Sequence, residues 1–224
     1  MTNNRKLTKY IYYVFIVFIS LSACSTSRVE TEKKDIAYAH ILNIKKNGII
    51  LRLPTYSKSI ETYKEFFEKS GDSTNYEKYD FLVKKATFLK KFAMKALNEK
   101  YNFSPVYVLP DTSITTFLSG KNKGVFLDSL GNIDESKEYA GEKPYFLLIK
   151  ETDNSLLVTD DHLLKLPSPF PADNISSLDN IILFERFNMG NLDFYDEFFT
   201  KDLAILNNKF WKFYKTSSIP LNNE

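Results

Sequence analysis

The most regular alternation of apolar and polar residues predicts a long amphipathic helix from Tyr76 to Lys100. Its apolar residues recur at steps of three and four, which places them on one face of a helix. They are Tyr79, Leu82, Ala86, Leu89, Ala93 and Leu97. The lysines are predicted to lie largely away from this face. Acidic residues interrupt their charge, so a solvated surface is favoured over a site for anionic lipid headgroups.

Two short apolar runs flank this helical region and are typical of strands. Ile49–Leu53 ends at Pro54, and the second run covers Pro105–Pro110. Between them lie the amphipathic stretch Ser59–Lys69 and the long helix. A strand, a helical connection and a second strand predict a parallel crossover unit, because parallel strands need a long connection.

Residues 35–46 fit two structures. Asp35 can cap a helix that ends at Asn47-Gly48, with two lysines in its last turn. Alternatively, Asn47-Gly48 can form the two-residue turn of a hairpin into Ile49–Leu53. Ala37 and Ala39 favour the helix.

The second half of the chain predicts shorter elements. Tyr145–Ile149 and Leu156–Val158 form an antiparallel hairpin across a polar turn. The other predicted elements are a brief helix over Thr112–Leu118 capped by Asp111, strands at Val125–Leu127 and Ile181–Phe184, and a helix over Asp193–Tyr214 with a possible break near Thr200. Together, the elements predict an α/β or α+β fold: a mixed β-sheet with flanking helices in a three-layer sandwich, forming one domain over residues 35–224.

The first residues are typical of an export signal. Arg5, Lys6 and Lys9 precede an apolar run, and no acidic residue occurs in residues 1–23. From Tyr10 to Ala23 there are 14 residues, whereas a membrane-spanning helix needs about 20. A cleaved secretory signal is therefore favoured over a membrane span.

Leu21-Ser22-Ala23-Cys24 resembles the lipobox of bacterial lipoproteins. The resemblance covers residues 1–24 and implies cleavage after Ala23, a diacylglyceryl group on the Cys24 thiol and an acylated new amino terminus. Ser25, in place of aspartate, implies the outer membrane. The alternatives for Cys24 are a stray cysteine beside a cleaved signal and a free core thiol. Residues 24–34 then form the lipidated cysteine and a polar, flexible tether.

The composition of the chain excludes several kinds of site and does not support one class of partner. Cys24 is the only cysteine, which excludes intramolecular disulfides, a cysteine nucleophile in the folded domain and multi-thiolate zinc sites. Three of the 30 basic residues belong to residues 1–23, which leaves 27 basic against 28 acidic residues. The mature chain is nearly neutral, so its charge does not support nucleic-acid binding.

The ends of the two parallel strands carry the candidate ligand-binding residues. Leu53-Pro54-Thr55-Tyr56-Ser57 and Leu109-Pro110-Asp111-Thr112-Ser113 follow the same pattern. Carboxyl ends of parallel strands border the ligand crevice of open α/β sheets. If the strands are neighbours, Thr55, Ser57, Asp111 and Ser113 converge with helix-start amides into a polar, anion-binding pocket. The favoured alternative is that these residues cap the following helices.

No motif predicts a metal or a cofactor. Thr159-Asp160-Asp161-His162 is the densest group of potential ligands, but His40 is the only other histidine, and a zinc site needs about three protein ligands. Residues 128–134 do not match the spacing of a calcium loop. Phosphate loops, nucleophile elbows and HExxH helices are absent from the sequence.

These patterns favour a lipid-anchored, non-enzymatic envelope protein that binds a protein partner, a polymer or a small ligand. The alternative is an envelope hydrolase or transferase with a serine, threonine or carboxylate site at the strand ends. A deep pocket with convergent carboxylates or an activated serine would favour the enzyme. An exposed, aromatic-rich patch would favour partner binding.

Overall fold

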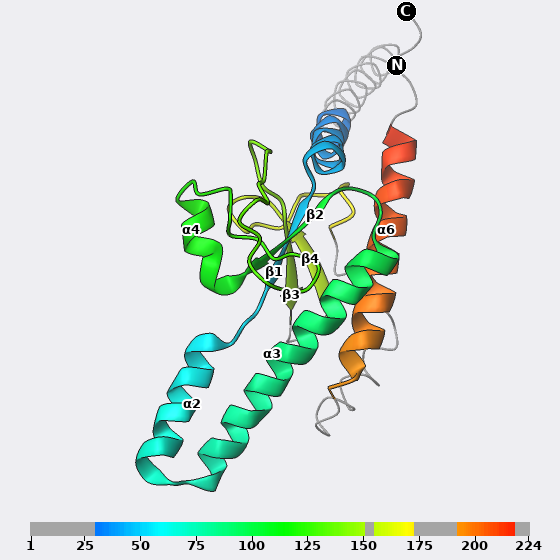
Figure 1. The fold of residues 1–224 in the computed structure, drawn as a ribbon. Coiled ribbons are helices and arrows are strands. Elements are labelled where there is room, and N and C mark those ends of the chain that lie inside the picture. Colours follow the sequence, from blue (N-terminus) through cyan, green and yellow to red (C-terminus); the bar gives the residue numbers. More distant parts are fainter. Residues whose placement is uncertain (1–29, 151–154, 173–191, 218–224) are drawn as a thin grey trace, which may run out of the picture.

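The computed structural model describes residues 30–150, 155–172 and 192–217 (Figure 1). Within these ranges a helix covers residues 30–47 and a four-stranded sheet forms the centre. The remaining elements are β1 (Ile49–Leu53), α2 (Ser57–Ser70), α3 (Ser73–Lys100), β2 (Val106–Pro110), the 3₁₀ helix η1 (Asp111–Ser113), α4 (Ile114–Leu118), β3 (Phe146–Lys150), β4 (Ser155–Thr159) and α6 (Phe194–Ser217).

The sheet is mixed, with strand order β2-β1-β3-β4. β1 pairs in parallel with β2 on one side and β3 on the other. β3 and β4 pair antiparallel. The predicted crossover and hairpin are therefore confirmed, as is the α/β class with a mixed sheet and flanking helices.

Alternation along β1 divides the core into two clusters. Ile49, Leu51 and Leu53 pack with the helix of residues 30–47, α3 and α6. Ile50 points to the opposite face, where Phe117 of α4 and residues of the loop between α4 and β3 cover the sheet. The result is three layers: helices, sheet, and α4 with its loop.

The segment before β1 is a helix and not a hairpin strand. Its buried residues Ala37, Ile41 and Ile44 are spaced by four and three, as expected for one helical face. Gly48 ends the helix with φ 94° and donates its N–H to the carbonyl of Ile44 at 2.8 Å. A left-handed glycine is a common helix stop, and the chain turns here directly into β1.

The α2–α3 hairpin extends beyond the sheet (Figure 1). The 28 residues of α3 span about 42 Å, whereas the five residues of β1 span about 17 Å. All buried residues of α3 lie from Lys85 onward, and α2 buries none. The first half of α3 therefore projects from the domain with α2 packed along it.

Several elements differ from the prediction. Residues 125–127 are not a strand, although Leu127 donates its N–H to the carbonyl of Val108 beside β2. α6 continues through Thr200 without a break, because buried Phe199 and Leu203 hold that turn against the core. Residues 30–34, predicted as tether, are helical and exposed, with Glu30 and Lys34 forming an i,i+4 ion pair at 3.1 Å. The export signal, Cys24 and the strand predicted at residues 181–184 lie outside the described residues.

Candidate functional site

The predicted strand-end residues come together because β1 and β2 are neighbours. Leu53 is paired with Pro110 at the end of the ladder, so Thr55 and Asp111 leave the sheet side by side. Asp111 Oδ1 accepts hydrogen bonds from the Thr55 amide at 3.2 Å and the Thr55 hydroxyl at 2.5 Å. Asp111 thereby ties the loop after β1 to the loop after β2.

Ser57 extends this cluster by one step. Its hydroxyl lies 2.9 Å from the Thr55 hydroxyl. Since the Thr55 proton goes to Asp111, Ser57 donates to Thr55. The direction of these bonds supplies no base to the Ser57 hydroxyl, which an activated nucleophile would need. Half-buried Ser113 lies in η1, and no hydrogen bond joins it to the other three within the described ranges.

Two residues of this region were not singled out by the sequence. Tyr56 lies between Thr55 and Ser57 and has the left-handed backbone conformation, with φ 53°. Its ring lies 4.5 Å from the Nζ atom of Lys85 on α3. Lys85 is only 7% exposed, and this burial lowers its pKa to about 8. The Tyr56 hydroxyl oxygen is itself buried without a hydrogen-bond partner among the described residues.

The two acidic segments considered above as metal sites, residues 159–162 and 128–134, form turns in which an aspartate accepts backbone hydrogen bonds. Asp160 Oδ1 accepts the amides of His162 at 2.9 Å and Leu164 at 2.8 Å. Asp128 Oδ1 accepts the amides of Leu130 and Asn132 in the same way. Across the described part of the chain, no cluster of three histidine, cysteine or acidic side chains has a metal-binding arrangement.

His40 packs against the core and lies near enough to Asp160 for this carboxylate to act against the lowering of its pKa. Its ring Nδ1 lies 2.9 Å from the Tyr145 hydroxyl, and its ring meets those of Tyr145 and Phe170 edge-on. Burial lowers the pKa of His40. His40 is therefore a half-buried histidine with structural contacts, and its lowered pKa favours the neutral ring near pH 7.

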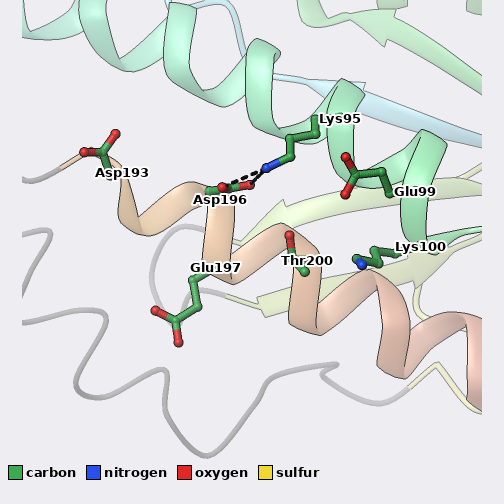
Figure 2. Close-up of a pocket in the computed structure, with 7 residues that line it drawn as sticks. All are labelled: Lys95, Glu99, Lys100, Asp193, Asp196, Glu197 and Thr200. Atoms are coloured by element: carbon green, nitrogen blue, oxygen red, sulfur yellow. Dashed lines mark hydrogen bonds and ion pairs between the residues drawn. The ribbon is translucent and has the colours of Figure 1, made fainter.

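An open hollow of about 340 Å³ lies between α3 and α6 (Figure 2). Lys95 reaches across it and donates to both carboxylate oxygens of Asp196 at 3.0 Å, which raises the pKa of Lys95. The other lining residues are Glu99, Lys100, Asp193, Glu197 and Thr200. Acidic residues in the first turn of α6 also complement its helix dipole. This hollow is a charged contact between two helices, and its walls offer little apolar surface to a ligand.

The tip of the α2–α3 hairpin carries an exposed aromatic patch. Phe66 and Tyr76 are 50% and 49% exposed. Half-buried Phe67 lies 5.1 Å from Tyr76 between ring centroids, and Tyr79 follows at 6.3 Å from Tyr76. These three contacting residues, together with exposed Phe66 next to Phe67 in the sequence, are called the tip patch. Aromatic residues are enriched at the centres of protein interfaces.

A scan against protein-family models, a search of curated proteins and a search of solved structures each find no match for this chain. Within the described residues, every helix is too short or too polar to cross a membrane.

Proposed function

We propose that this chain is a lipid-anchored, non-enzymatic protein of the bacterial envelope that binds a protein partner through the tip patch. The observation that carries the proposal is the projecting α2–α3 hairpin. It exposes two large aromatic side chains on elements that bury none of their own residues before Lys85. Exposed aromatic residues at the end of a projecting element add nothing to the core, and a partner would bury them.

The position of the proposed anchor supports this function. Cys24 lies six residues before residue 30. The start of the helix of residues 30–47 and the α2–α3 turn lie at opposite ends of the molecule (Figure 1). Acylation of Cys24, followed by residence in the outer membrane, would therefore place the tip patch at the end farthest from the bilayer.

The enzyme alternative rests on the strand-end cluster. Thr55, Ser57 and Asp111 do converge, and Lys85 lies behind Tyr56. Their hydrogen bonds satisfy one another and fasten two loops, which argues for a structural role. Binding at the tip patch is therefore the better-supported proposal.

The binding proposal is tested by site-specific crosslinking in intact cells. A photoreactive phenylalanine analogue at Phe66 is expected to give a discrete adduct with one envelope protein. The same analogue at Leu130, which is 81% exposed in a turn outside the hairpin, is the matched control. Tyr76→Ser should weaken the Phe66 adduct while circular dichroism shows that the protein remains folded. Equal adducts at both positions, or none at Phe66, would contradict the proposal.

The anchor is tested separately by acyl labelling and membrane fractionation. Wild-type protein should incorporate labelled fatty acid and migrate as the processed form with the outer membrane. Cys24→Ala should lose both the label and the processing. An unlabelled, unprocessed wild-type protein would refute the anchor and leave the crosslinking result standing.

A further inference from the structure

The last turns of α6 form a basic and aromatic surface. Lys209, Lys212 and Lys215 follow one another at steps of three, and no acidic residue occurs in α6 after Asp202. Lys212 and Lys215 are exposed. Half-buried Trp211 lies beside them, with the Lys215 Nζ atom 5.9 Å from its ring. The indole N–H of Trp211 donates to Asn102 Oδ1 at 2.9 Å, so this side chain is held by the domain and reports on its position. This group of four residues is called the α6 basic end.

The α6 basic end lies on the same side of the domain as the proposed anchor. The Tyr38 hydroxyl donates to the carbonyl of Thr216 at 2.9 Å, and the Tyr38 ring lies 5.9 Å from that of Phe213. Eight helical residues, about 12 Å, separate Tyr38 from residue 30. The six residues from Cys24 to residue 30 reach at most about 21 Å. The anchor therefore keeps the α6 basic end close to the bilayer.

We infer that the α6 basic end binds anionic lipid headgroups and orients the domain on the membrane. This inference rests on the proposed lipid anchor. Lysines near an anionic bilayer are attracted to its surface. Contact at this end would leave the α2–α3 turn, which lies at the opposite end of the molecule (Figure 1), away from the membrane.

Two comparisons favour contact of the α6 basic end with lipid headgroups over contact with solvent alone. Lysines in the last helical turn complement the helix dipole, but Lys209 lies more than two turns before Ser217. On the α2–α3 hairpin, lysines alternate with acidic residues and pair with them, as in Lys69–Glu65 at 3.3 Å and Lys84–Asp80 at 2.6 Å. The α6 basic end lacks this alternation, because no acidic residue lies among or after its lysines in the sequence of α6.

The single tryptophan of the chain allows a direct test. Full-length, acylated protein is reconstituted into vesicles that contain a dansyl-labelled headgroup lipid, with either phosphatidylcholine alone or phosphatidylcholine and phosphatidylglycerol. Energy transfer from Trp211 to dansyl should be higher with phosphatidylglycerol. The double variant K212E/K215E should lose this increase. The variant K64E/K69E on α2 makes the same change in net charge at the far end and should keep it.

The outcomes separate the anchor from the orientation. If wild-type protein floats with both kinds of vesicle but transfers energy equally in both, the anchor stands and the inference fails. It also fails if K64E/K69E removes the increase as fully as K212E/K215E. If wild-type protein does not float with either vesicle, the anchor fails and the inference falls with it.

Discussion

Lys85 is buried although its neighbours Lys84 and Lys91 on α3 are exposed. The sequence partly indicates the burial of Lys85, because this residue lies three positions after Leu82 and four before Leu89, next to the apolar face of α3. The pattern of lysines with interspersed acidic residues on α3 nevertheless predicts a solvated surface, and Lys85 belongs to that pattern. Only the packing of Tyr56 over its side chain shows the difference.

Burial of Lys85 predicts a pH dependence of stability. Its pKa falls from 10.5 to about 8 on folding, so the unfolded chain binds more protons between these values and stability rises with pH. Relative to Lys85→Met, the wild-type protein should gain roughly 1–3 kcal/mol between pH 8 and pH 10.5. Urea unfolding across this range measures the difference.

Lys84→Met is the matched control for this prediction. Lys84 is exposed and donates to Asp80, which raises its pKa. A raised pKa contributes stability at lower pH that is lost as the pH rises, so this variant cannot reproduce the sign expected for Lys85→Met. If the free energies of unfolding of wild type and Lys85→Met change in parallel with pH, burial of the Lys85 charge does not destabilise the folded state.

The Thr55–Asp111 contact predicts a measurable coupling. Asp111→Ala and Thr55→Val should each lower the free energy of unfolding by roughly 1–3 kcal/mol, because each leaves a polar group without its partner. The double variant should cost less than the sum. Ser113→Ala, which removes no bond to this cluster, is the control. Strictly additive losses of unfolding free energy would contradict the role of Asp111 in tying the two loops together.

At the scale of elements, hydrophobic spacing was the reliable signal. It predicted α3 from apolar residues at the helical period. It predicted β1, β2 and the β3–β4 hairpin from short apolar runs bounded by turn residues or prolines. Residues 125–127 have the composition of a strand. Gly124, with φ 68°, and the turn around Asp128 leave too few residues for pairing with β2.

The junction between the first helix and β1 predicts a strong glycine requirement. A Cβ atom at Gly48 would lie 2.6 Å from the carbonyl oxygen of Pro105, and φ is 94°. At Gly71, φ is 67° but a Cβ atom would meet nothing within 4 Å. Gly71→Ala should cost roughly 1–2 kcal/mol for its left-handed backbone, and Gly48→Ala clearly more. Chemical denaturation measures both, and equal costs would contradict the crowding at Gly48.

At the scale of the whole molecule, the described structure has two distinct ends (Figure 1). One combines the start of the first helix with the α6 basic end, and the other is the tip of the α2–α3 hairpin. A crossover helix longer than the strands it connects has to project, so the length of α3 creates the second end. The proposed function assigns the anchor to one of these ends and the binding of a partner to the other.

The sequence by itself determined the elements whose causes are local: the helical period of α3 and the strands before Pro54 and up to Pro110. Acylation of Cys24 stays a prediction from the sequence. The sequence also placed Thr55, Ser57 and Asp111 at strand ends. The tertiary structure alone decided that β1 and β2 are neighbours, so that Asp111 reaches Thr55, and that Lys85 is buried under Tyr56. It also decided that the hairpin leaves the domain. These features depend on contacts between residues far apart in the chain, which no local period or cap encodes.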